Sequence, residues 1–481
     1  MRRPASATFP WPRSAPTSAQ IDAFADAAVR SFWLDDLPRR HPPPRLEETI
    51  DTDLCIVGGG YTGLWAALHA KRDRPEREVV LLESDRCGEG ASGRNGGFLD
   101  ASLTHGLSNG LARFADEMPQ LERLGLENFT GLCEDVERYG IDADLEQTGF
   151  LSLALEPHEL AELEEEAELL SRFGKSAELL DQAAVRAEVD SPTYLGGLWE
   201  RTGAALVHPG KLVDGLRQAA SRAGVGIYEH SPVDGLKEDG PGVLATTAAG
   251  RVRARRVLLA TSAYPPLLPA IRHYVAPVYD YALMTEPLSQ ERRQAIGWQH
   301  RQGLGDCANR FHYYRQTRDH RILFGGYDAV YRRGGPVAAR LDDHRETFAT
   351  LSQHFFTTFP QLEGVRFTHR WGGAIDTCSR FSVFFGLALG GRASYATGYT
   401  GLGVGASRFG AQVALDLLDG RHTQASDLRF VRSRPVPFPP EPLRSAVIEL
   451  TRNRLAAADL HEGRRGLWLR TLDRLGLGFD S

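Results

Sequence analysis

Asp53-Leu54-Cys55-Ile56-Val57-Gly58-Gly59-Gly60-Tyr61-Thr62-Gly63-Leu64 is the stretch of this chain that decides its fold. It joins a short apolar strand to the pattern Gly58-x-Gly60-x-x-Gly63, and residues 64–70 continue as a helix. Gly58 permits a tight turn, Gly60 lets the backbone approach a pyrophosphate, and Gly63 lets the helix pack against the sheet. Because the helix N-terminus then faces the phosphates, the stretch predicts a dinucleotide-binding turn.

A second apolar strand supports this interpretation. Val79-Val80-Leu81-Leu82 ends on Glu83, twenty positions after Gly63, where a carboxylate can accept hydrogen bonds from a ribose. A structural glycine turn in another α/β protein remains the alternative, but it does not require the strand, helix, second strand and terminal acid together. The pattern therefore favours an α/β protein with a Rossmann-like domain.

Composition narrows the class of protein. A chain of 481 residues is too long for one ordinary core, so we expect two closely joined domains. Hydrophobic residues make up 42% and charged residues 25%, which is typical of a globular protein. The formal net charge is only -6 and no long basic run occurs, so we expect no nucleic-acid partner. No run of eighteen apolar residues exists, so we expect no membrane span.

The cysteines indicate a reducing compartment. They are odd in number and scattered, with no CxxC pair, so neither a metal site nor a disulfide framework is expected: Cys55, Cys87, Cys133, Cys307 and Cys378. The start Met1-Arg2-Arg3-Pro4 carries a twin arginine, but no apolar core follows it, so we expect no signal peptide. Together these features predict a cytoplasmic protein.

The order of sequence patterns predicts two interleaved domains and two flanking segments. We expect a helical patch around 21–33 in the first segment, and an amphipathic helical tail at the end of the chain. That tail could touch a lipid surface or a partner subunit, although an ordinary docked helix is the better interpretation. The predicted division is an N-terminal arm (1–50), a nucleotide-binding domain (51–145, 201–267 and 380–425), a substrate domain of α+β type on an antiparallel or mixed sheet (146–200 and 268–379) and the tail (426–481).

Three further segments distinguish the cofactor from a nicotinamide. The loop 84–97 is rich in small residues and backbone donors, which suits a flat polar ring and a phosphate. The strand 256–264 ends in small residues that can lie beside a nucleotide. The turn 398–405 opens a helix whose N-terminus can face a ring oxygen that becomes negative on reduction.

These segments, in this order, resemble the FAD-dependent oxidoreductases of the D-amino-acid oxidase superfamily from about Asp51 to Gly420. The phrases at 90–97, 370–373 and 398–404 look most like its gamma-glutamylputrescine oxidoreductase branch. The resemblance implies FAD contacts for the following residues: Gly58, Gly60, Tyr61, Thr62, Gly63, Glu83, Ser84, Ala91, Ser92, Arg94, Asn95, Gly96, Gly97, Val233, Ala260, Thr261, Gly373, Gly401, Leu402 and Gly403.

The same resemblance implies noncovalent FAD. Monomeric sarcosine oxidases carry flavin on a cysteine just before a strand of the substrate domain. In this chain His312 occupies that position, and Cys307 lies five residues earlier.

Candidate catalytic residues lie on one expected strand, His312-Tyr313-Tyr314-Arg315. Alternation puts Tyr313 and Arg315 on one face, where the arginine could clamp a carboxylate and the tyrosine could add a hydroxyl. His312 could serve as an acid or base, because imidazole titrates near neutrality. Tyr279 and Tyr281 are better explained as core residues, and Asp376 is a candidate for holding an ammonium group.

The resemblance implies oxidation of a small amine or amino acid by hydride transfer to FAD, followed by hydrolysis of the imine. The substrate would resemble gamma-glutamylputrescine or an N-substituted amino acid, with oxygen or a carrier as acceptor. Two alternatives stay open: a flavin dehydrogenase of an alcohol or hydroxy acid that passes electrons to a quinone, and a non-catalytic flavin-binding protein. The sequence does not predict the oligomeric state.

Overall fold

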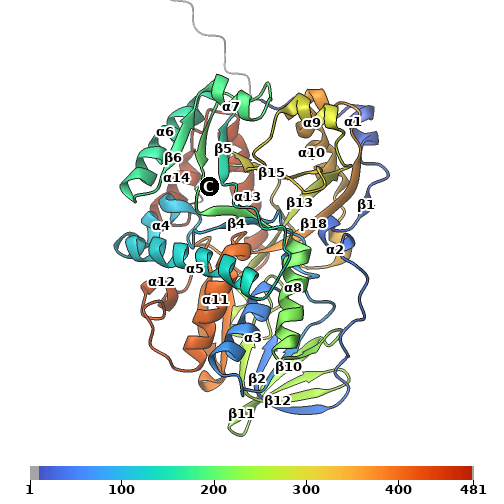
Figure 1. Cartoon of the computed structure of the whole chain (residues 1–481). Helices are drawn as coiled ribbons and strands as arrows, with labels where there is room; N and C mark the ends of the chain where they lie inside the picture. Colours follow the sequence, from blue (N-terminus) through green and yellow to red (C-terminus); the bar gives the residue numbers. More distant parts are fainter. Residues whose placement is uncertain (1–9, 479–481) are drawn as a thin grey trace, which may run out of the picture.

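The glycine turn joins strand β2 (Thr49–Val57) to helix α3 (Tyr61–Asp73) in a computed structural model of the protein (Figure 1). The structure describes residues 10–478, so the twin arginine at the start of the chain lies outside the described residues. β2 pairs in parallel with β3 (Val79–Leu82) and with β12 (Arg251–Leu259). The strand, turn, helix and second strand expected from the sequence are therefore present.

These strands belong to an eight-stranded sheet in the lower half of Figure 1, with the order β10-β11-β12-β2-β3-β9. β20 pairs with β12 in parallel, and β19 pairs with β20. Helices α11 and α8 both pack against α3. The further elements of this half are β9 (Gly226–Tyr228), β10 (Val233–Asp239), β11 (Gly242–Thr247), β19 (Phe384–Ala388), β20 (Ala393–Thr397), α8 (Pro209–Arg222) and α11 (Gly403–Leu418).

A ten-stranded mixed sheet forms the upper half, in the order β1-β18-β13-β16-β15-β14-β5-β7-β6, with β17 also on β13. Among the described residues, its parallel pairs are β1–β18 and β5–β14. Its strands are β1 (Ala28–Val29), β5 (Phe150–Ala154), β6 (Ala177–Leu180), β7 (Gly196–Glu200), β13 (Ala276–Thr285), β14 (Gly303–Asp306), β15 (His312–Gln316), β16 (Ile322–Gly326), β17 (Val330–Tyr331) and β18 (Phe367–Thr377).

Helices and a small ribbon complete the body. A two-stranded ribbon, β4 (Phe98–Asp100) with β8 (Ala204–Leu206), lies between the two large sheets in Figure 1. The other helices are α4 (Gly106–Phe114), α5 (Met118–Arg138), α6 (Pro157–Arg172), α7 (Gln182–Glu188), α9 (Gln290–Ile296), α10 (Arg345–Thr358) and α12 (Arg429–Arg432).

The two sheets draw their strands from alternating segments of the chain, which confirms the expected fold class of a Rossmann-like domain with an interleaved α+β domain. The nucleotide sheet takes strands from 49–82, 226–259 and 384–397, and the mixed sheet takes most of its strands from 150–200 and 276–377. The exact domain limits stay a proposal, which these strand memberships support.

The N-terminal arm differs from the helical patch expected around 21–33. It forms two short helices, α1 (Ser18–Asp22) and α2 (Phe32–Asp35), with strand β1 between them. The free edge of β18 explains the difference, because Ala28 and Val29 pair there with His369 and Arg370. Tertiary hydrogen bonding at a sheet edge therefore overrides local helical pattern.

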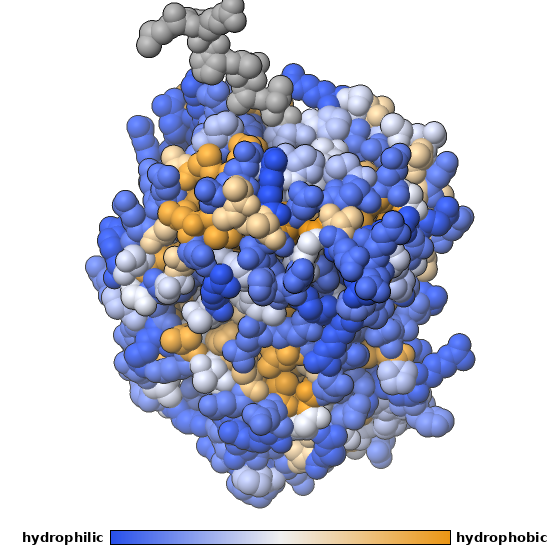
Figure 2. Space-filling view, turned by 45° about the horizontal axis from the view of Figure 1, so that its top comes forward, coloured by the Kyte–Doolittle hydropathy of each residue, from blue (hydrophilic) through white to orange (hydrophobic). Residues whose placement is uncertain are grey.

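The C-terminal tail is docked on the body. After the short α12, its helices are α13 (Leu443–Asp459) and α14 (Leu467–Arg474), and Leu469 of α14 is buried. The Asp459 carboxylate accepts hydrogen bonds from the backbone N–H and the side-chain amide of Asn309, at 3.0 and 2.8 Å. Within residues 10–478, no helix combines the length and apolarity that a bilayer crossing needs. The face in Figure 2 is largely hydrophilic, with hydrophobic side chains in a few separate patches.

Candidate cofactor and substrate site

One cavity of about 1290 Å³ runs from the glycine turn to the mixed sheet. Gly58 and Glu83 line it at one end, and Asp280 and Tyr313 line it on the side of the substrate sheet. Typical ligand pockets measure about 300–1,000 Å³. This cavity is therefore large enough for a dinucleotide and a small substrate together.

The glycine turn fits the close approach of a nucleotide. Gly58 has φ +114°, and a Cβ there would lie 2.4 Å from the backbone oxygen of Ala260. A Cβ on Gly63 would lie 1.9 Å from the backbone oxygen of Gly58. Because both obstacles are backbone, only glycine keeps this turn between β2 and α3 in place. Gly63 itself lies outside the cavity lining and performs the helix-packing part of the expected role.

Glu83 lines the cavity at the end of β3 and is held by three donors. Its Oε2 accepts the backbone N–H of Gly59 at 2.6 Å. Its Oε1 accepts the hydroxyl of Ser84 at 2.9 Å and the backbone N–H of Asp85 at 3.0 Å. The carboxylate is thus fixed beside the turn with lone pairs still available to a ligand hydroxyl.

The loop 91–97 is fixed by side chains far away in the sequence. Ser31 donates its hydroxyl to the carbonyl of Gly93 at 2.6 Å. The indole N–H groups of Trp33 and Trp371 donate to the carbonyls of Asn95 and Arg94, each at 2.8 Å. The N-terminal arm and the substrate sheet therefore shape a loop that also lines the cavity.

Arg94 and Asn95 use their side chains inside the protein. The Arg94 guanidinium donates to Asp342 Oδ2 at 2.6 Å and to Glu89 Oε1 at 3.0 Å. Asn95 donates to the carbonyls of Ala91 and Ser92, each at 3.0 Å. Both residues line the cavity. Because the Arg94 guanidinium is paired with two acids, the contact with flavin proposed for these residues depends on the position of the loop and not on an unpaired guanidinium.

Most of the residues predicted to bind FAD line this cavity. The cavity lining includes Gly58, Gly60, Tyr61, Thr62, Glu83, Ser84, Ala91, Ser92, Arg94, Asn95, Gly96, Val233, Ala260, Thr261, Gly373, Gly401, Leu402 and Gly403. Gly63 and Gly97 are not among the lining residues. Gly97 has φ +78°, and a Cβ there would meet the carbonyl of Val207 at 2.3 Å.

Asp376 holds the second glycine turn. Its Oδ2 accepts the backbone N–H of Gly398 at 2.7 Å and the hydroxyl of Thr397 at 3.3 Å. Burial raises the pKa of Asp376 to about 6, although these hydrogen bonds act in the other direction. Asp376 was a candidate from the sequence for holding an ammonium group. In the structure its carboxylate orients the turn at the start of α11.

His312 is a buried core residue rather than a group that faces substrate. Its Nδ1 lies 2.7 Å from Asp306 Oδ2, and its Nε2 lies 3.0 Å from His354 Nδ1. Burial lowers the pKa of His312 to about 3, so the ring is neutral at ordinary pH. His312 lies outside the cavity lining, and the structure therefore does not support it as an acid or base.

Arg315 is also placed differently from the expected carboxylate clamp. It lies on the face of β15 that Tyr313 shares, as alternation predicts, but it is fully buried. Its Nη1 donates to the carbonyl of Val207 at 2.5 Å and to the carbonyl of Gly97 at 3.2 Å. The guanidinium therefore fixes the end of the loop 91–97 and lies behind the cavity wall.

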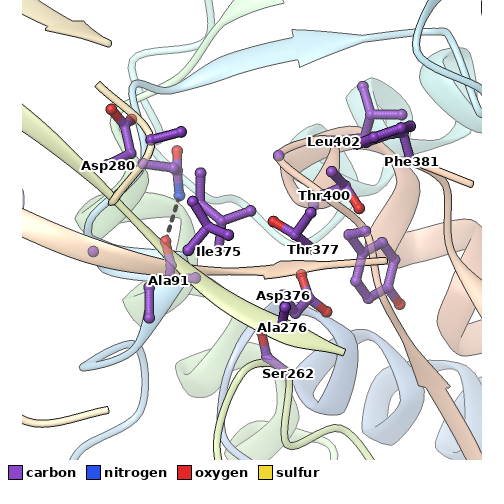
Figure 3. A pocket seen from close by; sticks show the side chains of 18 of the residues that line it. Ala91, Ser262, Ala276, Asp280, Ile375, Asp376, Thr377, Phe381, Thr400 and Leu402 are labelled. Atoms are coloured by element: carbon purple, nitrogen blue, oxygen red, sulfur yellow. Dashed lines mark hydrogen bonds between the residues drawn. The ribbon is translucent and has the colours of Figure 1, made fainter. Parts of the chain in front are cut away.

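Tyr313 faces the cavity and leads to a residue that sequence reasoning missed. Its hydroxyl donates to Asp280 Oδ2 at 2.5 Å. Figure 3 shows Asp280 on one side of the pocket, across from Thr400, Leu402 and Phe381. The sequence feature that could have identified Asp280 is an acidic residue in the middle of the otherwise apolar strand β13. Tyr279 and Tyr281 flank it with largely buried rings, as expected for core residues.

The tail supplies a wall of the same cavity, which the sequence did not reveal. Side chains from both tail helices line it, including Ile448, Leu455, Leu469 and Leu472. Local periodicity predicts the helices but not the surface that they cover. The tail is therefore both docked on the body and part of the cavity wall, and the electron acceptor stays a proposal.

Comparison with known proteins agrees with this geometry. A model of the family described as FAD dependent oxidoreductase matches residues 53–417. The chain is 34% identical to a gamma-glutamylputrescine oxidoreductase of Escherichia coli (strain K12) over 397 residues, which cover 81% of this chain and 89% of that protein. It is 28% identical to a glycine oxidase of Geobacillus kaustophilus over 221 residues, 45% of this chain and 56% of that one.

Solved structures show the same fold. The crystal structure of glycine oxidase from Geobacillus kaustophilus matches with a TM-score of 0.63 and 21% identity, covering 80% of this chain and 99% of that one. L-proline dehydrogenase from P. horikoshii matches with a TM-score of 0.62 and 20% identity, covering 81% and 96%.

Proposed function

The chain belongs to the family of FAD-dependent oxidoreductases, and we propose that it oxidises the C–N bond of a small amine or amino acid. The observation that carries this proposal is one cavity that begins at the glycine turn and reaches β13. We call its part beside β13, lined by Asp280 and Tyr313, the chamber. A cofactor and a substrate can meet in such a cavity without leaving it. Similarity to a gamma-glutamylputrescine oxidoreductase supports an amine that resembles gamma-glutamylputrescine, and an N-substituted amino acid is the other candidate.

Residues of the nucleotide half would hold the FAD. Gly58 and Gly60 would leave room for the diphosphate, Glu83 would accept a ribose hydroxyl, and Val233, which also lines the cavity, would meet the adenine. Residues 401–403 bring the N-terminus of α11 to the far end, where its dipole favours negative charge. The chemistry that bound FAD would supply is acceptance of the hydride lost from the carbon beside the amine nitrogen.

We propose that the FAD is held noncovalently. His312 stands where a linking cysteine would be expected, and it is buried against Asp306. Burial, with nearby acids such as Glu159, raises the pKa of the Cys307 thiol well above its ordinary value. Because the thiolate is the reactive form, Cys307 is a poor site of attachment. Acid precipitation should release all yellow colour, and colour retained on the protein would contradict this part.

The chain's own residues bind the substrate, aim it and exclude water. The chamber is walled by β13 and β15 on one side and by the tail helices on another. Such enclosure keeps the bound amine in one orientation and limits access of water during the reaction. We propose a cytoplasmic location, in keeping with cysteines that are free thiols.

The test is anaerobic titration of the purified yellow protein with gamma-glutamylputrescine, putrescine, sarcosine and glycine. We expect at least one amine to bleach the flavin absorbance, and then expect peroxide in air if oxygen is the acceptor. Bleaching without peroxide would indicate an electron carrier instead. A flavoprotein that no amine bleaches would contradict the proposed function.

A further inference from the structure

Asp280 is a carboxylate in the chamber that lacks a cationic partner. Its Oδ1 accepts the backbone N–H of Tyr281 at 2.8 Å, and its Oδ2 accepts the hydroxyl of Tyr313 at 2.5 Å. Across the described residues 10–478, no Arg, Lys or His lies within ion-pair distance of it. A carboxylate enclosed by protein without a counter-charge is costly, so its retention requires an explanation.

The strands beside Asp280 leave space for a ligand. Gly373 of β18 pairs directly with Asp280, and it carries no side chain. On β16, a Cβ at Gly325 would lie 2.7 Å from the hydroxyl oxygen of Tyr313. Glycine at 325 therefore makes room for the Tyr313 ring, and glycine at 373 places no side chain opposite Asp280; both Asp280 and Tyr313 line the cavity.

The cations around the cavity are already engaged by other acids. Arg94, from the loop 91–97, pairs with Asp342 at 2.6 Å. Arg452, from α13, pairs with Asp328 at 2.7 Å. The other two arginines of the lining, Arg310 and Arg465, pair with Asp459 and Asp473. Asp280 therefore lines the cavity without a positively charged partner among the described residues.

Resting on the proposed function, we propose that Asp280 is the group that binds the substrate's ammonium and removes one of its protons. The proton passes from R–CH₂–NH₃⁺ to the carboxylate, leaving R–CH₂–NH₂ and a neutral acid, and no electrons move. The neutral amine has the nitrogen lone pair that assists loss of hydride from the adjacent carbon. Tyr313 is a positioning residue, because its hydroxyl holds the accepting oxygen in place.

The charges that surround Asp280 are consistent with this role. Burial raises the pKa of Asp280 to about 6, hydrogen bonds from Tyr313 and Tyr281 lower it, and the negative charge of Asp328 raises it. The carboxylate form is therefore available above about pH 6. Because the chamber is lined mainly by apolar atoms, a neutral amine and a neutral acid are favoured there over two poorly solvated ions.

The test measures the rate of anaerobic flavin reduction by gamma-glutamylputrescine, and by putrescine in parallel, between pH 5 and 9. In the unmodified enzyme we expect the ratio of the reduction rate to the dissociation constant to fall as the pH drops below about 6. This fall is the acid limb of the pH profile. Asp280→Asn should lower this ratio by about 10²–10⁴ and abolish that acid limb. Its FAD content should stay unchanged, because the substitution is isosteric and lies outside the nucleotide wall.

Two variants that keep Asp280 provide an independent check, should Asp280→Asn fail to fold. Asp328→Asn removes a neighbouring negative charge, so the pKa of Asp280 should fall and the acid limb should move to lower pH. Tyr313→Phe removes a hydrogen bond that favours the carboxylate, so the limb should move to higher pH. A role confined to packing predicts no such opposite shifts.

The outcomes separate this inference from the proposed function. If no amine reduces the flavin of the unmodified enzyme, the proposed function fails. If amines reduce it, and Asp280→Asn keeps both the rate and the acid limb, the role of Asp280 is overturned and the function stands. Unmoved acid limbs in both Asp328→Asn and Tyr313→Phe would overturn it equally.

Discussion

The glycine turn and the chamber beside β13 use different kinds of group. At the turn, the important atoms are backbone: the carbonyl of Ala260 approaches Gly58, and the carbonyl of Gly58 approaches Gly63. In the chamber, the important groups are side chains brought together from β13, β15 and the tail. A backbone constraint leaves a local mark in the sequence, whereas a side-chain constellation does not.

Two charged residues in the substrate half, one buried and one partly buried, show the same contrast. Arg315 on β15 is satisfied by the carbonyls of Val207 and Gly97, so it belongs to the scaffold. Asp280 on β13 has hydrogen bonds but no counter-charge among the described residues, so it remains available to a ligand. Residue type and strand position alone do not distinguish these two situations, because both depend on distant partners.

The largest expected loss of FAD binding is at the turn. Gly63→Ala places a Cβ 1.9 Å from a backbone oxygen, so the turn and α3 must separate. We expect FAD binding to weaken about 100-fold, or about 3 kcal/mol, measured by flavin absorbance per protein and by FAD titration of the apoprotein. Gly420→Ala is the matched control: with φ +67° and open space around it, it should cost about 1 kcal/mol of stability and leave FAD binding unchanged.

Arg315→Met tests whether Arg315 stabilises the fold or binds the carboxylate of a substrate. Loss of the guanidinium leaves the carbonyls of Val207 and Gly97 without that donor, so we expect the free energy of unfolding to fall by about 2–4 kcal/mol. Denaturant unfolding gives that value. The KM values for sarcosine and for putrescine should change by the same factor. A selective loss for sarcosine, which carries a carboxylate, would instead support the clamp.

His312→Gln tests the neutral histidine of the core. Burial lowers the pKa of His312 to about 3, whereas an unfolded histidine titrates near 6.5. Its neutral form therefore contributes fully above about pH 6.5, and stability is lost as the pH falls from there toward 3. At pH 5 the loss from this one group is about 2 kcal/mol.

The measurement is the free energy of unfolding at pH 7.5 and pH 5. The difference between the two pH values should be smaller in His312→Gln than in the unmodified protein by that amount. His461→Gln, at an exposed position of the tail, serves as the control and should leave the difference unchanged. Equal pH differences in His312→Gln and the unmodified protein would contradict a buried neutral ring.

The smallest expected effect is at the junction of tail and body. Asp459→Asn removes the carboxylate that accepts two hydrogen bonds from Asn309 and one from Arg310. We expect a loss of about 1–2 kcal/mol that is confined to the tail, seen as faster proteolytic cleavage within 443–478. Glu449→Gln, with an exposed side chain, should leave cleavage unchanged. Uniform destabilisation of the whole protein would argue against a separately docked tail.

Local patterns predicted the elements of the nucleotide half well. The strand, turn, helix and second strand ending at Glu83 all form, because each is set by apolar periodicity or by glycine chemistry within a few residues. The arm was predicted less well, since the edge of β18 recruits Ala28 and Val29 into a strand. The face shared by Tyr313 and Arg315 was also predicted, but the depth of each side chain was not.

By itself the sequence determined the fold class, the nucleotide turn and the family, because these depend on short-range backbone geometry repeated at several separated motifs. Only the tertiary structure decided that Arg315 and His312 lie behind the cavity wall, that Asp280 faces the chamber, and that the tail encloses it. Burial, counter-charge and enclosure are properties of the packed neighbours of a residue. Strands far apart in the chain supply those neighbours, so no local pattern encodes them.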